Sequence, residues 1–139
     1  MHRILISALA LGLAAGSAQA FTAINGLTVA PVQGGFEVVT RGADGPRQIW
    51  CAAAEYARQA QGAGGNDRLY ILRGYGASLS ESGKRGVVFT LHPDSELANG
   101  PRPGTDGNYS VSMRRVGYNL RTAHAEQFCA DTFEDVWPF

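Results

Sequence analysis

The chain has no excess of charge of either sign, because its 12 lysines and arginines balance 12 aspartates and glutamates. Proteins that bind nucleic acid or anionic membranes through their overall charge carry a basic surplus, so we expect neither as a partner. Histidine and cysteine are also scarce, at three and two residues. A zinc site needs more soft ligands than this chain groups together, so we expect no metal and no cofactor.

Long apolar runs are absent after residue 20, so we expect no stable membrane insertion. The one apolar run, residues 4–15, follows His2 and Arg3 and precedes the small residues of positions 16–20. This pattern predicts a cleaved signal peptide over residues 1–20, with a transmembrane anchor as the alternative. The protein is therefore expected to be periplasmic or secreted, with residues 21–139 forming a single disulfide-stapled domain.

The two cysteines, in an oxidising compartment, are interpreted by default as one disulfide between Cys51 and Cys129. Two buried free thiols or a pair of metal ligands are the alternatives. A disulfide here would close a long loop and restrict the unfolded chain by about 4 kcal/mol in the loop-entropy model.

The clearest predicted element is a helix over residues 46–61, PRQIWCAAAEYARQAQ. Asp44 is expected to cap it, Pro46 suits its first turn, and Gly62 ends it. Cys51 falls to the side of the apolar arc and would face a second helix. The arc itself comprises Ile49, Trp50, Ala53, Ala54, Tyr56, Ala57 and Ala60.

The patterns of apolar residues predict strands over residues 27–32, 36–41, 68–73, 86–92 and 108–116, the first two forming a hairpin. Residues 68–73 have four successive apolar residues rather than alternation, which suggests a central place in the sheet. A second helix is predicted to begin near Asn119 or Thr122, either of which could cap it, and to run to about Thr132. The aromatic tail, residues 134–139, is expected to pack on the domain. The order β-β-α-β-β-β-α predicts an α+β two-layer sandwich, with a mostly antiparallel sheet and both helices on one face.

The sheet face opposite the helices is predicted to be polar and open to a partner. It would carry Glu37, Arg41, Thr90, His92, Ser110, Ser112 and Arg114. The candidate binding residues are His92, Ser110, Ser112 and Arg114 of this face, with Lys84 and Arg85 of the neighbouring loop. The alternative function is a small secreted hydrolase that uses His92 with Ser110 or Ser112. A flat strand face, however, supplies no donors for an oxyanion.

Two motif-like segments do not support a ligand site. The glycine-rich loop of residues 74–85 has Ser78 and Arg85 where a phosphate-binding loop needs glycine and Ser or Thr. The oxygen-bearing residues Asp94, Glu96, Asp106 and Asn108 could bind calcium, but their spacing is not that of an EF-hand. Residues of this kind are by default solvated turn formers.

The segment Trp50-Cys51-Ala52-Ala53-Ala54, together with Phe128-Cys129, resembles a group of small exported bacterial proteins of unknown function. These carry a W-C-A-A-A helix and a closing F-C. The resemblance implies export and the disulfide, and it implies no chemistry. We therefore expect a monomeric, exported, non-catalytic domain that binds an unknown protein or envelope component.

Overall fold

The computed structural model describes residues 20–132, which form one sheet, two α-helices and a short 3-10 helix. The predicted signal peptide, apart from its last residue, and the predicted packing of the aromatic tail lie outside the described residues. In chain order the elements are β1 (Phe21–Thr22), β2 (Thr28–Val32), β3 (Gly35–Val39), α1 (Pro46–Gln61), β4 (Arg68–Ala77), β5 (Arg85–Thr90), η1 (Leu97–Asn99), β6 (Asn119–Arg121) and α2 (Thr122–Gln127).

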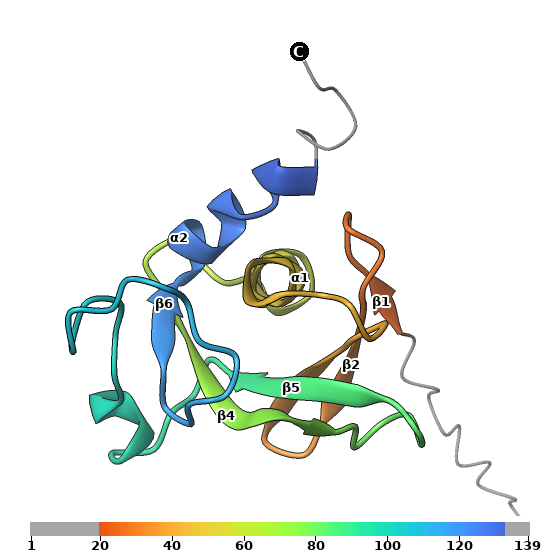
Figure 1. Ribbon diagram of the computed structural model, residues 1–139, viewed down its shortest axis with the longest axis horizontal. Coiled ribbons are helices and arrows are strands. Elements are labelled where there is room, and N and C mark those ends of the chain that lie inside the picture. The colour runs from red at the N-terminus through yellow and green to blue at the C-terminus, as the bar shows by residue number, and fades with distance from the viewer. Residues whose placement is uncertain (1–19, 133–139) are drawn as a thin grey trace, which may run out of the picture.

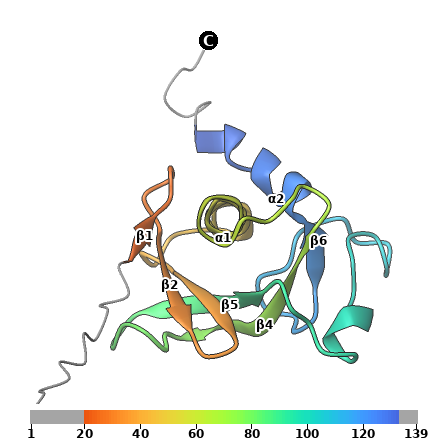
Figure 2. The same cartoon turned by 180° about the vertical axis from the view of Figure 1, so that it is seen from behind.

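The six strands form one antiparallel sheet in the order β1-β2-β3-β5-β4-β6. The sheet curves around α1, with β1 and β2 on one side and β6 on the other, and α2 lies beyond α1 (Figure 1 and Figure 2). The predicted α+β sandwich with an antiparallel sheet is therefore confirmed. The predicted order of elements also holds broadly, with β1 added at the start.

The predicted first hairpin is formed by β2 and β3, which pair from Thr28 opposite Val39 to Val32 opposite Gly35. A Cβ at Gly35 would collide with the carbonyl oxygen of Phe89 on β5, so the hairpin can lie against β5 only with glycine there. The hairpin thus joins the rest of the sheet through β3.

Helix α1 has the predicted bounds, and Gly62 follows it in the left-handed conformation. The helix is buried around more of its circumference than the predicted arc, because the sheet and α2 lie on different sides of it (Figure 1). Cys51 and Ala52, which lie outside that arc, are fully buried, whereas Ala60 is exposed.

The predicted cap of α1 is wrong. The Asp44 carboxylate accepts hydrogen bonds from the backbone N–H and the guanidinium of Arg41, at 2.6 and 2.9 Å. The residue at the cap position is Gly45, whose N–H donates to the Gln48 side chain at 2.8 Å. The capping interaction therefore comes from the first turn of the helix itself.

The predicted strand over residues 108–116 is also wrong, since this segment is irregular and the last strand is β6. Its polar side chains form local turns instead: Asn108 accepts from the Ser110 N–H, and the Ser112 hydroxyl accepts from the backbone N–H groups of Arg114 and Arg115. Such local hydrogen bonds compete with strand pairing, and periodicity alone does not reveal them.

Helix α2 is shorter than predicted, ending at Gln127, and neither expected residue caps it. Asn119 is buried in β6, where its side-chain N–H groups donate to the carbonyl oxygens of Gly117 and Gly100 at 2.9 and 3.2 Å. Thr122 donates its hydroxyl to the carbonyl of Asp67. Both side chains therefore fix loops to the sheet.

The predicted disulfide joins Cys51 of α1 to Cys129 after α2, with the Cα atoms 5.0 Å apart. Two ion pairs connect the same regions, Arg47 with Asp131 at 2.7 Å and Arg58 with Glu126 at 3.3 Å. The disulfide is thus one of several links that join α1 to α2 and to the residues that follow α2.

Candidate binding site around Tyr75

The predicted binding residues are distributed over three parts of the molecule. Lys84, Arg85 and Arg114 lie near one another, beside Tyr75. His92 lines a hollow with Gln61 and Gly62 at the end of α1, and Ser110 lines another with Pro46 and Arg47 at its start.

The 16 residues of α1 extend about 24 Å, so His92 and Ser110 lie at opposite ends of a long helix. Ser112 is also near the start of α1, because its carbonyl oxygen accepts from the Trp50 indole N–H at 2.7 Å. The structure therefore brings His92 near neither serine, and the hydrolase alternative lacks the pair on which it depends.

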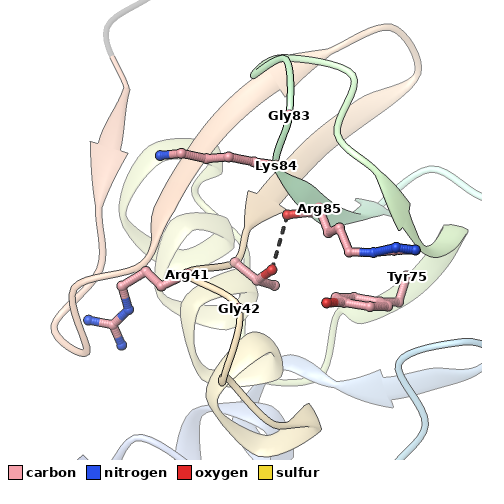
Figure 3. A pocket seen from close by; sticks show the side chains of 7 residues that line it. Arg41, Gly42, Tyr75, Gly83, Lys84 and Arg85 are labelled. Carbon is pink, nitrogen blue, oxygen red and sulfur yellow. Dashed lines mark hydrogen bonds between the residues drawn. The ribbon is translucent and has the colours of Figure 1, made fainter.

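A hollow of about 420 Å³ lies where the end of β3 meets the β4–β5 hairpin; we call it the Tyr75 hollow. Figure 3 shows Arg85 lying over the Tyr75 ring, while Lys84 and Arg41 extend from the other side of the hollow. The cationic groups thus stand around its rim and point in different directions. The full lining is Thr40, Arg41, Gly42, Tyr75, Gly83, Lys84 and Arg85.

Tyr75 gathers a second guanidinium from outside the hollow. The guanidinium carbons of Arg85 and Arg114 lie 5.3 and 5.1 Å from the centre of its ring. Interactions of this kind contribute about 0.5–1 kcal/mol each at exposed sites. Arg114 reaches Tyr75 because Gly74 lets the 112–115 segment approach: a Cβ at Gly74 would collide with the Arg114 carbonyl.

The positive charges around Tyr75 are only partly neutralised. Arg41 pairs with Asp44 at 2.9 Å, and Lys84 lies 3.5 Å from Glu81. Arg85 and Arg114 form no ion pair with any carboxylate within residues 20–132. Two guanidinium groups with no carboxylate partner and a shared aromatic ring form a surface suited to an anion.

One wall of the Tyr75 hollow is tied to the rest of the sheet through backbone and side-chain hydrogen bonds. Both the N–H and the hydroxyl of Thr40 donate to the carbonyl oxygen of Arg85, at 2.9 and 3.2 Å. These bonds continue the β3–β5 pairing beyond Val39. The backbone that carries Arg85 is therefore fixed while its side chain stays at the surface.

The sheet face behind the hollow is not open, contrary to the sequence interpretation. Glu37, predicted to be exposed on that face, is only 1% exposed, and Thr90 is 2% exposed. The loop of residues 78–84 folds over Glu37, whose carboxylate accepts hydrogen bonds from this loop. A sequence pattern that alternates along a strand shows which residues share a face, but not which loop covers that face.

The Glu37 carboxylate keeps its charge despite burial. Burial by itself raises the pKa of Glu37, but hydrogen bonds from the Ser78 and Ser80 hydroxyls and from the Leu79 and Ser80 N–H groups lower it. The hydrogen bonds outweigh burial, so the pKa of Glu37 lies below its ordinary value.

Metal ligation finds little support in the geometry. Within residues 20–132, the one group of three potential ligand atoms within 4.8 Å of one another comes from Cys51, Glu55 and Cys129, and both sulfurs are in the disulfide. Asp94 and Asp106, interpreted from the sequence as turn residues with calcium binding as the alternative, accept hydrogen bonds from the backbone N–H groups of Leu97 and Asn108, as turn residues do.

No family model matches the chain, and no curated protein or solved structure is significantly similar to it. None of the helices in the described part of the chain is long and apolar enough to cross a membrane. The site must therefore be interpreted from its own geometry. The sequence indicated Lys84, Arg85 and Arg114 but not Tyr75, and it did not indicate that the loop covers Glu37. The Ser-Leu-Ser run after β4 was the available signal for that contact.

Proposed function

We propose that this protein is an exported, non-catalytic binding domain that holds an anionic partner on the Tyr75 hollow. The observation that supports the proposal is a cluster of cations around the Tyr75 hollow, on a protein whose formal net charge is zero. These cations are Arg41, Lys84, Arg85 and Arg114. A local excess of one sign on a neutral protein directs binding to that place rather than to the whole surface.

The partner is an extended group with several negative charges, either an acidic segment of another exported protein or an acidic component of the envelope. The guanidinium carbons of Arg85 and Arg114 are at most about 10 Å apart, because they lie 5.3 and 5.1 Å from the centre of the same ring. Lys84 and Arg41 extend from the far side of the hollow (Figure 3). A single small anion would reach only part of this rim, whereas a chain of carboxylates could contact several cations together.

Export is supported by the disulfide, since such bonds persist in oxidising compartments. Together with the predicted signal peptide, it favours the periplasm or the extracellular medium. Intact mass measurement of the exported protein tests this directly. The expected species begins at Phe21 and lacks the two thiol hydrogens; a chain that retains residues 1–20 or both thiols would contradict the proposal.

Charge reversal at the Tyr75 hollow tests the binding function, with poly-L-glutamate as the probe. Arg85→Glu should lower the affinity at least tenfold, because it removes one cation and places a carboxylate beside Tyr75. Isothermal titration calorimetry at low ionic strength measures the affinity, which should also fall as salt is added.

Arg102→Glu is the matched control, since it makes the same change of net charge at an exposed loop residue outside the lining of the hollow. An equal loss of affinity in both variants would show that only overall charge matters. That outcome would remove the Tyr75 hollow as the binding site.

A further inference from the structure

We infer that Glu37 is a positioning residue, which fixes the loop of residues 78–84 as a preformed wall of the Tyr75 hollow. The purpose of this wall rests on the proposed function. The fixing of the loop rests on contacts within the chain alone, and it can be tested without a partner.

Three successive residues of the loop donate hydrogen bonds to the one carboxylate. The hydroxyl groups of Ser78 and Ser80 each donate to one Glu37 oxygen at 2.6 Å, and the Ser80 N–H donates to the same oxygen at 3.1 Å. The Leu79 N–H donates to the other oxygen at 2.8 Å. Hydrogen bonds to a charged acceptor are roughly twice as strong as neutral ones, so this is a firm attachment.

The attachment connects parts of the chain 41 to 43 residues apart, so it is not a local turn. It reaches the hollow through the loop's own backbone: the Ser78 N–H donates to the Lys84 carbonyl, and the Lys84 N–H donates to the Glu81 carbonyl, at 2.9 and 3.3 Å. Because Lys84 belongs to the lining, a restraint at Ser78 also restrains the wall.

The neighbouring strand leaves room for the carboxylate. Gly86 on β5 lies beside Glu37, and a Cβ there would be 2.9 Å from both the Cγ and the Cδ of Glu37. The pairing of β4 with β5 shifts register before and after Arg73, which bends the hairpin that carries the loop. Glycine and bend together let the loop fold back onto Glu37.

A fixed wall favours binding because the loop need not be ordered when the partner arrives. Surface loops rich in serine and glycine are otherwise mobile, and ordering side chains at an interface opposes association. Glu37 therefore acts on the partner through Lys84 and Arg85, not by touching it.

Amide hydrogen exchange measured by NMR tests the attachment. Glu37→Gln and Ser80→Ala should each accelerate exchange at Leu79 and in the rest of the loop, the former at least tenfold, while amides of β5 stay protected. Glu96→Gln and Ser82→Ala are the matched controls, because both residues are exposed and neither is hydrogen-bonded to Glu37.

Unchanged loop exchange in Glu37→Gln would overturn the inference. If that variant loses protection throughout β5 as well, Ser80→Ala decides the question, since it keeps three of the four hydrogen bonds and the buried charge. Faster loop exchange in Ser80→Ala then supports the inference, and unchanged exchange refutes it.

The direction in which Glu37→Gln changes the affinity for poly-L-glutamate separates a positioning role from a purely electrostatic one. Glu37→Gln removes a negative charge, so electrostatics alone would tighten binding, whereas loss of the fixed wall should weaken it several-fold. Tighter binding would refute the positioning role. If the unsubstituted protein does not bind this probe, the proposed function fails, and hydrogen exchange still decides the role of Glu37.

Discussion

At the scale of the residue, Glu37 shows how a carboxylate can be buried without an ion pair to any cation of residues 20–132. Its two oxygens accept from two hydroxyls and two backbone N–H groups, all from one loop. A buried charge of this kind is stable only while the donors stay in place, since an unpaired buried charge is strongly unfavourable. The residue and the loop therefore depend on each other.

The lowered pKa of Glu37 makes its contribution to stability depend on pH in a defined direction. Because the folded pKa lies below the unfolded one, the contribution is present at neutral pH and is lost as the pH falls through the folded pKa. Glu37→Gln should lower the free energy of unfolding by about 1–3 kcal/mol at neutral pH. Urea unfolding at several pH values should show this difference shrinking on acidification, and a constant difference would contradict the assignment.

The sequence predicted that Glu37 and His92 are both exposed. His92 is exposed, but the prediction for Glu37 is wrong for a physical reason. Strand alternation identifies the side of the sheet to which a residue belongs. Glu37 does lie on the side away from the core, whereas its strand neighbours Phe36 and Val38 lie in the core. Alternation carries no information about loops that return over that side. Lys84 and Arg85 were found because adjacent charged residues in a loop seldom become buried.

At the scale of the element, the opposed glycines Gly76 and Gly86 of the β4–β5 hairpin differ in what surrounds them. Gly86→Ala should destabilise the protein by about 1–3 kcal/mol, because the new methyl group would press on Glu37 and on the Val38 carbonyl. Gly76→Ala should be neutral or slightly stabilising, since its nearest non-adjacent atom is 3.7 Å away. Thermal unfolding of both variants makes the comparison, and equal effects would refute the close packing at position 86.

Elements with strong end signals were predicted well, whereas residues 108–116, predicted from alternation alone, do not form the expected strand. Gly62 after α1 and Gly34 between β2 and β3 determine where the chain must turn. Residues 108–116 alternate as a strand does, but Asn108 and Ser112 use their side chains for local turns. Whether such a segment forms a strand or local turns depends on whether a partner strand lies beside it, and only the fold supplies that information.

At the scale of the whole molecule, the disulfide closes a loop of 78 residues that includes β4, β5 and β6. Replacing both Cys51 and Cys129 by alanine should lower the free energy of unfolding by about 4 kcal/mol, chiefly by freeing the unfolded chain. Denaturant titration measures this loss. The unsubstituted protein under reducing conditions should lose a similar amount, and if neither loss appears, the disulfide is not the main constraint.

The pairing of β3 with β5 also has a kinetic consequence. The β2–β3 and β4–β5 hairpins each close locally, but they can meet only after α1 and its connections have come together, and such non-local pairings form slowly. The Tyr75 hollow takes its lining from the segment that follows β3 and from the β4–β5 hairpin, and Glu37 of β3 is hydrogen-bonded to the loop of that hairpin. A partner bound in the hollow would therefore contact residues on both sides of the β3–β5 pairing. It should slow the separation of the two hairpins and so lower the unfolding rate of the protein.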